Sequence, residues 1–164
     1  MTQSEAQLRM DRMRYTKNKL SANLVLLSIV FNALYFVSLY QSDVASYYYN
    51  YLTGASIIYN LVFMLAAFLC SEGVKSRKGN FWLALTVLGA GQIVRMFVIP
   101  ARAHSAVVKI SGVETVVMGN GQYAYIIVCL ALSAACCLIA AATSFAQNRA
   151  LRSYMANAAN AASK

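Results

Sequence analysis

The sequence predicts an all-α integral membrane protein with four transmembrane helices in an antiparallel bundle and a small extracytoplasmic β-hairpin between helices 3 and 4. Three observations lead to this fold class. Of the 164 residues, 60% are hydrophobic and only 12% are charged, whereas soluble domains carry about 25% charged residues. Four apolar runs match the length of about 20 residues that a membrane-spanning helix needs. Nearly all Lys and Arg residues lie outside these runs.

A basic segment, residues 1–19, precedes the first predicted span, residues 20–40. The segment carries five Lys or Arg residues, and we expect it to lie at the cytoplasmic membrane surface. There it acts as a topology signal or contacts anionic lipid. The span exceeds the about 7–15 apolar residues of a cleavable signal peptide, so we expect it to stay uncleaved.

The second predicted span covers residues 51–70, and residues 71–80 form a short basic hairpin on the cytoplasmic side. This hairpin holds three Lys or Arg residues and has no room for a domain. Phe81 and Trp82 then begin the third span, residues 81–99. Aromatic side chains are enriched at membrane interfaces, so their position supports this boundary.

The outer loop, residues 100–121, begins at Pro100, which we expect to stop the third helix. The β-branched residues of the loop flank a Gly-containing two-residue turn at 111–112, a pattern typical of a β-hairpin. In the resulting register Lys109 faces Glu114. An isolated hairpin is marginal in water, so we expect these two residues to mark a contact with the bundle, a second copy or another protein.

The last predicted span covers residues 122–146, and a cytoplasmic tail, residues 147–164, follows it. Small side chains let membrane helices approach closely. The span is rich in them: Ala131, Ser133, Ala134, Ala135, Cys137, Ala140, Ala141 and Ala142. We therefore predict that this helix packs closely against other helices of the chain or of another subunit. Residues 1–164 thus form a single four-span membrane domain.

The charge distribution predicts the orientation. With four spans, the first segment, the middle hairpin and the tail share one side of the membrane, and they hold eleven of the fourteen Lys and Arg residues. By the positive-inside rule both termini are cytoplasmic. The protein is expected in the plasma membrane, with anionic lipid at its cytoplasmic face. A net charge of +9 spread in this way indicates membrane-surface attraction and not nucleic-acid binding.

A polar cluster inside the predicted spans is the candidate site. Arg95 lies within an apolar span, where a charge costs about 2.5 kcal/mol or more near the bilayer centre. Helical rise places amide and hydroxyl side chains of two other spans at a similar depth. The candidate residues are Arg95, Gln92, Asn32, Asn60, Tyr35 and Ser56.

The cluster has three interpretations. It could bind an anion or another ligand from outside. Alternatively, Arg95 snorkels to the outer interface while the amides hold helices together. In the third, Arg95 pairs with a carboxylate of another subunit, because all five acidic residues lie outside the predicted spans.

The sequence offers no catalytic constellation, no cofactor motif and no metal-ligand spacing. His104 stands without a second His or a neighbouring carboxylate, and the four cysteines lie in apolar runs. We therefore expect a non-enzymatic accessory or assembly subunit of a larger membrane complex, with a transporter as the favoured class. The alternative is a self-assembling small channel or facilitator for a neutral or anionic solute. An enzyme using Cys136 or Cys137 is weakly supported, since apolar surroundings suppress thiol reactivity.

Overall fold

The structure is a computed structural model that describes residue 5 and residues 17–40, 51–77, 80–98, 100–105, 107–110, 113–116 and 118–162. Its elements are α2 (Lys19–Tyr40), α4 (Tyr51–Lys75), α5 (Phe81–Val98), α6 (Pro100–Ser105), β1 (Val107–Ile110), β2 (Val113–Val116) and α7 (Asn120–Ala162). Most of the predicted basic segment 1–19 lies outside the described residues.

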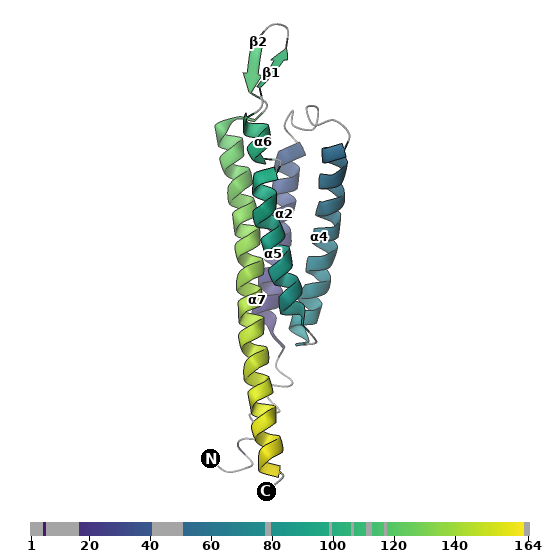
Figure 1. Cartoon of the computed structure of the whole chain (residues 1–164), viewed down its shortest axis with the longest axis vertical. Helices are drawn as coiled ribbons and strands as arrows, with labels where there is room; N and C mark the ends of the chain where they lie inside the picture. Colours follow the sequence, from purple (N-terminus) through teal and green to yellow (C-terminus); the bar gives the residue numbers. More distant parts are fainter. Residues whose placement is uncertain are drawn as a thin grey trace.

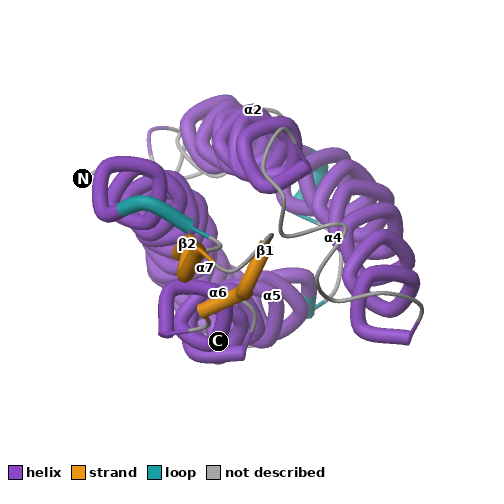
Figure 2. Tube along the Cα trace, turned by 90° about the horizontal axis from the view of Figure 1, so that it is seen from above, coloured by secondary structure: helices purple, strands orange, loops and turns teal. Residues whose placement is uncertain are grey.

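Four helices, α2, α4, α5 and α7, are long and apolar enough to cross a membrane, judged by length and composition. Helices that follow one another in the chain run in opposite directions (Figure 1). Seen from above, they stand around the bundle in the order α2, α4, α5, α7 (Figure 2). The chain is therefore a multi-pass helical bundle of membrane type, as its composition predicts.

The end of α4 differs from the sequence-based expectation. Helix α4 continues past residue 70 to Lys75, because Gly73 does not end it. An added Cβ at Gly73 would overlap the Phe81 ring, so this glycine instead lets α4 approach the start of α5. The turn falls at Arg77, which has a left-handed φ of 52° and whose N–H donates to the Val74 carbonyl over 3.1 Å.

Helices also occur where the sequence suggested a loop and a tail. Helix α5 ends at Val98, just before Pro100, as expected. Pro100 also begins a further short helix, α6, which fits the preference of proline for the first helical position. Helix α7 runs on to Ala162 as one element of 43 residues, so the tail expected after residue 146 continues the last span. In Figure 1 its end extends well beyond the other helices.

Strands β1 and β2 pair antiparallel above the bundle (Figure 1). Their Cα register runs from Val107 opposite Val116 to Ile110 opposite Val113, and it places Lys109 opposite Glu114. The side chains of Lys109 and Glu114 lie outside what the structure describes, so their predicted contact stays a prediction.

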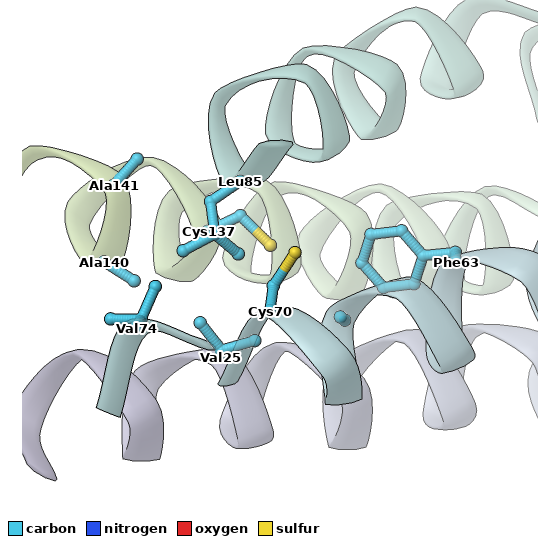
Figure 3. Packing of buried hydrophobic residues seen from close by; sticks show 9 residues of the cluster. Val25, Phe63, Cys70, Val74, Leu85, Cys137, Ala140 and Ala141 are labelled. Atoms are coloured by element: carbon cyan, nitrogen blue, oxygen red, sulfur yellow. The ribbon is translucent and has the colours of Figure 1, made fainter. Parts of the chain in front are cut away.

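Two apolar clusters form the core. One joins α2, α4, α5 and α7 on the side away from the strands (Figure 3). Its buried members are Val25, Phe63, Ala67, Cys70, Val74, Leu85, Cys137, Ala140 and Ala141. The other lies nearer the strands and contains Tyr35, Leu39, Met118, Ile126, Cys129 and Leu130. Small residues of α7 are buried in both clusters. At Gly89 an added Cβ would lie 2.9 Å from Leu138, so α5 and α7 pack closely there.

Candidate functional site

All six residues of the predicted polar cluster come together in the interior of the bundle. Arg95 and Gln92 lie three residues apart on one face of α5, Ser56 and Asn60 lie four apart on α4, and Asn32 and Tyr35 lie three apart on α2. Residues at these spacings share a helix face, which is why three helices present all six toward one another. Each of the six is buried.

Arg95 is the centre of a hydrogen-bond network. Its Nη1 donates to Asn60 Oδ1 over 2.8 Å and to Asn32 Oδ1 over 3.2 Å. Its Nη2 donates to Ser56 Oγ over 3.2 Å. Three of the five guanidinium N–H groups thus have acceptors among the described residues, and all three acceptors are neutral.

The amides also bond to one another. Asn32 Nδ2 donates to Asn60 Oδ1 over 3.1 Å, and Gln92 Nε2 donates to Asn32 Oδ1 over 3.1 Å. Asn60 Nδ2 donates to the Ser56 carbonyl of its own helix over 3.1 Å. The two amide oxygens that accept hydrogen bonds from Arg95 are therefore also held in place by donors from α2 and α5.

Two tyrosine rings lie against the guanidinium. The Arg95 Cζ atom is 4.3 Å from the Tyr35 ring centroid and 4.9 Å from the Tyr59 centroid, within the range of cation–π attraction. Tyr35 had been expected as a partner, and it contacts Arg95 by its ring face. Tyr59 was missed, although it shares a helix face with Ser56, three residues away, and could have been found by that spacing.

Arg95 does not snorkel out of the bundle. Its side chain is only 6% exposed, and its donors turn inward to Asn32 and Asn60. The snorkelling interpretation requires a guanidinium that reaches past its own helix to an interface. The geometry instead places the charge among three helices.

No described carboxylate neutralises this charge. The ion pair found among the described residues joins Lys75 to Glu72 at 2.8 Å, and Glu72 lies near the other end of α4. Five neutral groups therefore surround Arg95: three hydrogen-bond acceptors and two aromatic rings. They stabilise the guanidinium but leave its net positive charge in place.

Two polar atoms of the cluster have no hydrogen-bond partner in the described part of the chain. They are the Tyr35 hydroxyl and Gln92 Oε1, and both residues are fully buried. A buried polar atom without a partner costs about 1–3 kcal/mol. The network therefore has capacity for a further polar group.

A pocket of about 210 Å³ lies beside the network, between α4 and α5. It is lined by Ala55, Ser56, Tyr59, Gly91, Val94, Arg95 and Val98. Ala55, Val94 and Val98 are exposed on the outer surface of the bundle, so the pocket opens sideways. Ser56 and Arg95 give it a polar floor, and its walls are mostly apolar.

The remaining candidates lie apart from this site. His104 stacks on Tyr123 with ring centroids 4.4 Å apart. Within the described ranges no group of three or more His, Cys, Asp or Glu residues could hold a metal ion. The four cysteines are free and buried, and Cys137 Sγ donates to Ser28 Oγ over 3.2 Å.

No family model, curated protein or solved structure matches this chain. What the site does is therefore inferred from its own geometry and chemistry.

Proposed function

We propose that this chain is a non-enzymatic accessory or assembly subunit of a larger membrane complex, with a transporter as the favoured class. Its own contribution to that complex is an anion-binding site at Arg95. The observation that carries this proposal is a buried, permanently charged guanidinium whose partners among the described residues are all neutral and which lies at the floor of a sideways-opening pocket.

The energetics of the site favour a counter-ion. An Arg in a membrane helix costs about 2.5–3.5 kcal/mol or more at the centre and less toward an end such as the last turn of α5, where Arg95 lies. Neutral acceptors offset part of this cost. The amides Asn32, Asn60 and Gln92 can join the three helices without Arg95. A charge that adds cost without adding a needed helix contact is best explained by an anionic group that reaches it.

The anion must come from outside the described part of this chain, because no carboxylate there lies near Arg95. A guanidinium binds carboxylate and phosphate oxygens through two parallel hydrogen bonds. Two of its N–H groups have no acceptor among the described residues, which leaves donors for such a contact. We take this anion to belong to another molecule, which fits a subunit that works together with a partner.

We further propose that both termini are cytoplasmic, that the protein resides in the plasma membrane, and that β1 and β2 lie outside. Lys19 at the start of α2, Lys75 at the end of α4 and Arg152 near the end of α7 lie at the bundle end opposite the strands. Basic residues favour the cytoplasmic side and attract anionic lipid there.

The alternative, a self-assembling channel or facilitator, has less support. Arg95 and the amides of the network occur at one level of the bundle. On the side of that level away from the strands, the buried polar groups include single hydroxyls such as those of Ser28 and Ser133. Ser133 Oγ donates to the Ser28 carbonyl, and the residues of one apolar cluster lie at this side. A solute path through this bundle would need a continuous polar lining there. The network resembles a closed layer more than part of a continuous path.

Purification of the tagged chain from its native host in a mild non-ionic detergent tests the subunit proposal. We expect a second membrane protein to co-elute at a constant ratio and to be identified by mass spectrometry. An unrelated membrane protein with the same tag, purified in parallel, gives the background. A stable monomer without a partner would contradict the proposal.

Flux measurements in liposomes separate the two functions. Liposomes that contain the chain alone should pass small neutral and anionic solutes no faster than empty ones. Flux that requires the purified chain and is lost in Arg95→Ala and in Asn60→Leu would favour the facilitator.

A further inference from the structure

We propose that the pocket between α4 and α5 binds a membrane-dissolved amphiphile with a single acyl chain and a carboxylate, such as a long-chain fatty acid. The carboxylate bonds to Arg95 at the pocket floor, and the acyl chain lies against the apolar walls. This inference rests on the proposed anion site and names its ligand class.

The opening of the pocket indicates where the ligand comes from. Val94 is 63% exposed and Ala55 and Val98 are exposed beside it, on helices that are apolar enough to cross a membrane. Such surfaces face hydrocarbon. A ligand that enters between α4 and α5 must therefore be soluble in the bilayer. A free inorganic anion is not, so it fits this pocket less well than an amphiphile does.

The floor of the pocket indicates the head group. Arg95 and Ser56 are its polar lining residues together with the Tyr59 hydroxyl. The rings of Tyr35 and Tyr59 lie over the guanidinium, so a new acceptor must approach in the guanidinium plane. A planar carboxylate matches that approach, because its two oxygens can accept parallel N–H bonds.

The size of the pocket favours one chain over two. Its volume of about 210 Å³ is below the about 300–1,000 Å³ of typical small-molecule sites. Gly91 contributes to this shape, since an added Cβ would lie 2.6 Å from Tyr59 Oη. The phenol of Tyr59 therefore reaches across to α5 and limits the width of the pocket beside Arg95.

Binding of radiolabelled palmitate to the purified full chain in detergent tests the proposal. We expect saturable binding that hexadecanol does not displace, because the alcohol lacks the charge, and that acetate does not displace, because it lacks the chain. Arg95→Gln should weaken palmitate binding by about tenfold or more, as expected for the loss of a charge-assisted pair.

A second pair of variants keeps the test valid if Arg95→Gln folds poorly. Val94→Trp fills the pocket mouth from an exposed position, and Val87→Trp places the same side chain on the same helix at a site 67% exposed and outside the pocket lining. We expect Val94→Trp to lower palmitate binding at least as much as Arg95→Gln does. Val87→Trp should bind like the wild type.

Three results would overturn the proposal: no saturable palmitate binding, equal binding of hexadecanol, or equal loss in both Trp variants. Tighter binding of diacyl phosphatidate than of palmitate would also overturn it and assign the site to a phospholipid head group. If palmitate fails to bind while a partner protein still co-purifies, the ligand assignment fails and the subunit proposal stands. If palmitate binds but the chain purifies as a monomer without a partner, the ligand assignment stands and the subunit proposal fails.

Discussion

At the residue scale, the contribution of Asn60 to the stability of the fold should depend on the charge of Arg95. Asn60 Oδ1 accepts from Arg95 over 2.8 Å, and hydrogen bonds to charged groups contribute about 1.5–3 kcal/mol. Asn60→Leu should therefore destabilise the folded chain by about that amount, because it leaves the guanidinium with fewer acceptors. Thermal unfolding in detergent measures the effect.

The matching double variant separates this coupling from a packing effect. Arg95→Met removes the charge, so Asn60→Leu should cost much less in the Arg95→Met background than in the wild type. Equal costs in both backgrounds would mean that the contact between the two side chains contributes little, and that the network is held mainly by its amides.

Part of this network could be predicted from the sequence. A charge within an apolar span identified Arg95, and counting helical rise placed Asn32 and Asn60 near its level. The sequence could not show that the guanidinium turns inward, because that depends on how α2 and α4 face α5. It also could not show the pocket, whose existence depends on the spacing between α4 and α5 at Gly91.

At the element scale, glycines determine how closely the helices approach. An added Cβ at Gly89 would lie 2.9 Å from Leu138 and 3.4 Å from the Ala134 carbonyl. Gly89→Ile should therefore push α5 away from α7 and destabilise the chain by about 1–3 kcal/mol, the usual cost of overpacking. Chemical or thermal unfolding in detergent checks this value.

Gly54 is the matched control. It lies in the first turn of α4 with nothing within 4 Å of an added Cβ, so Gly54→Ala should leave stability unchanged or raise it by up to about 1 kcal/mol through helix propensity. Leu138→Ala should restore part of the loss in Gly89→Ile, because it removes the clashing side chain. Equal effects at Gly54 and Gly89 would show that the α5–α7 contact is looser than the 2.9 Å approach of Leu138 to an added Cβ at Gly89 implies.

The helix boundaries show where sequence patterns are informative and where they are not. Hydropathy predicts the four long helices because apolar length is a property of the segment itself. The end of α4 depends on packing, since Gly73 is covered by Phe81 and the chain turns only at Arg77. Helix α6 was missed because Pro100 can either follow a helix or begin one, and the local sequence does not distinguish these two roles.

At the scale of the whole molecule, the strands and the end of α7 lie at opposite ends of the bundle (Figure 1). If the proposed orientation is right, single cysteines introduced at these ends should react with a membrane-impermeant maleimide from opposite sides. Val107→Cys should be labelled on intact cells and Ser153→Cys only after permeabilisation, since both positions are exposed.

The four natural cysteines provide the background for this experiment. All are buried within the helices, so the unmodified chain should label weakly in its folded state. Labelling of Ser153→Cys on intact cells would contradict the orientation derived from the basic residues.

Binding of an anionic group to Arg95 at the α4–α5 pocket can be observed in a high-resolution experimental structure of the protein extracted with its native lipids. We predict density in the pocket, elongated and not belonging to this chain, with an acceptor within hydrogen-bond distance of the Arg95 guanidinium. A pocket closed by the α4 and α5 side chains, with no negatively charged group in reach of Arg95, would contradict an anion site at Arg95.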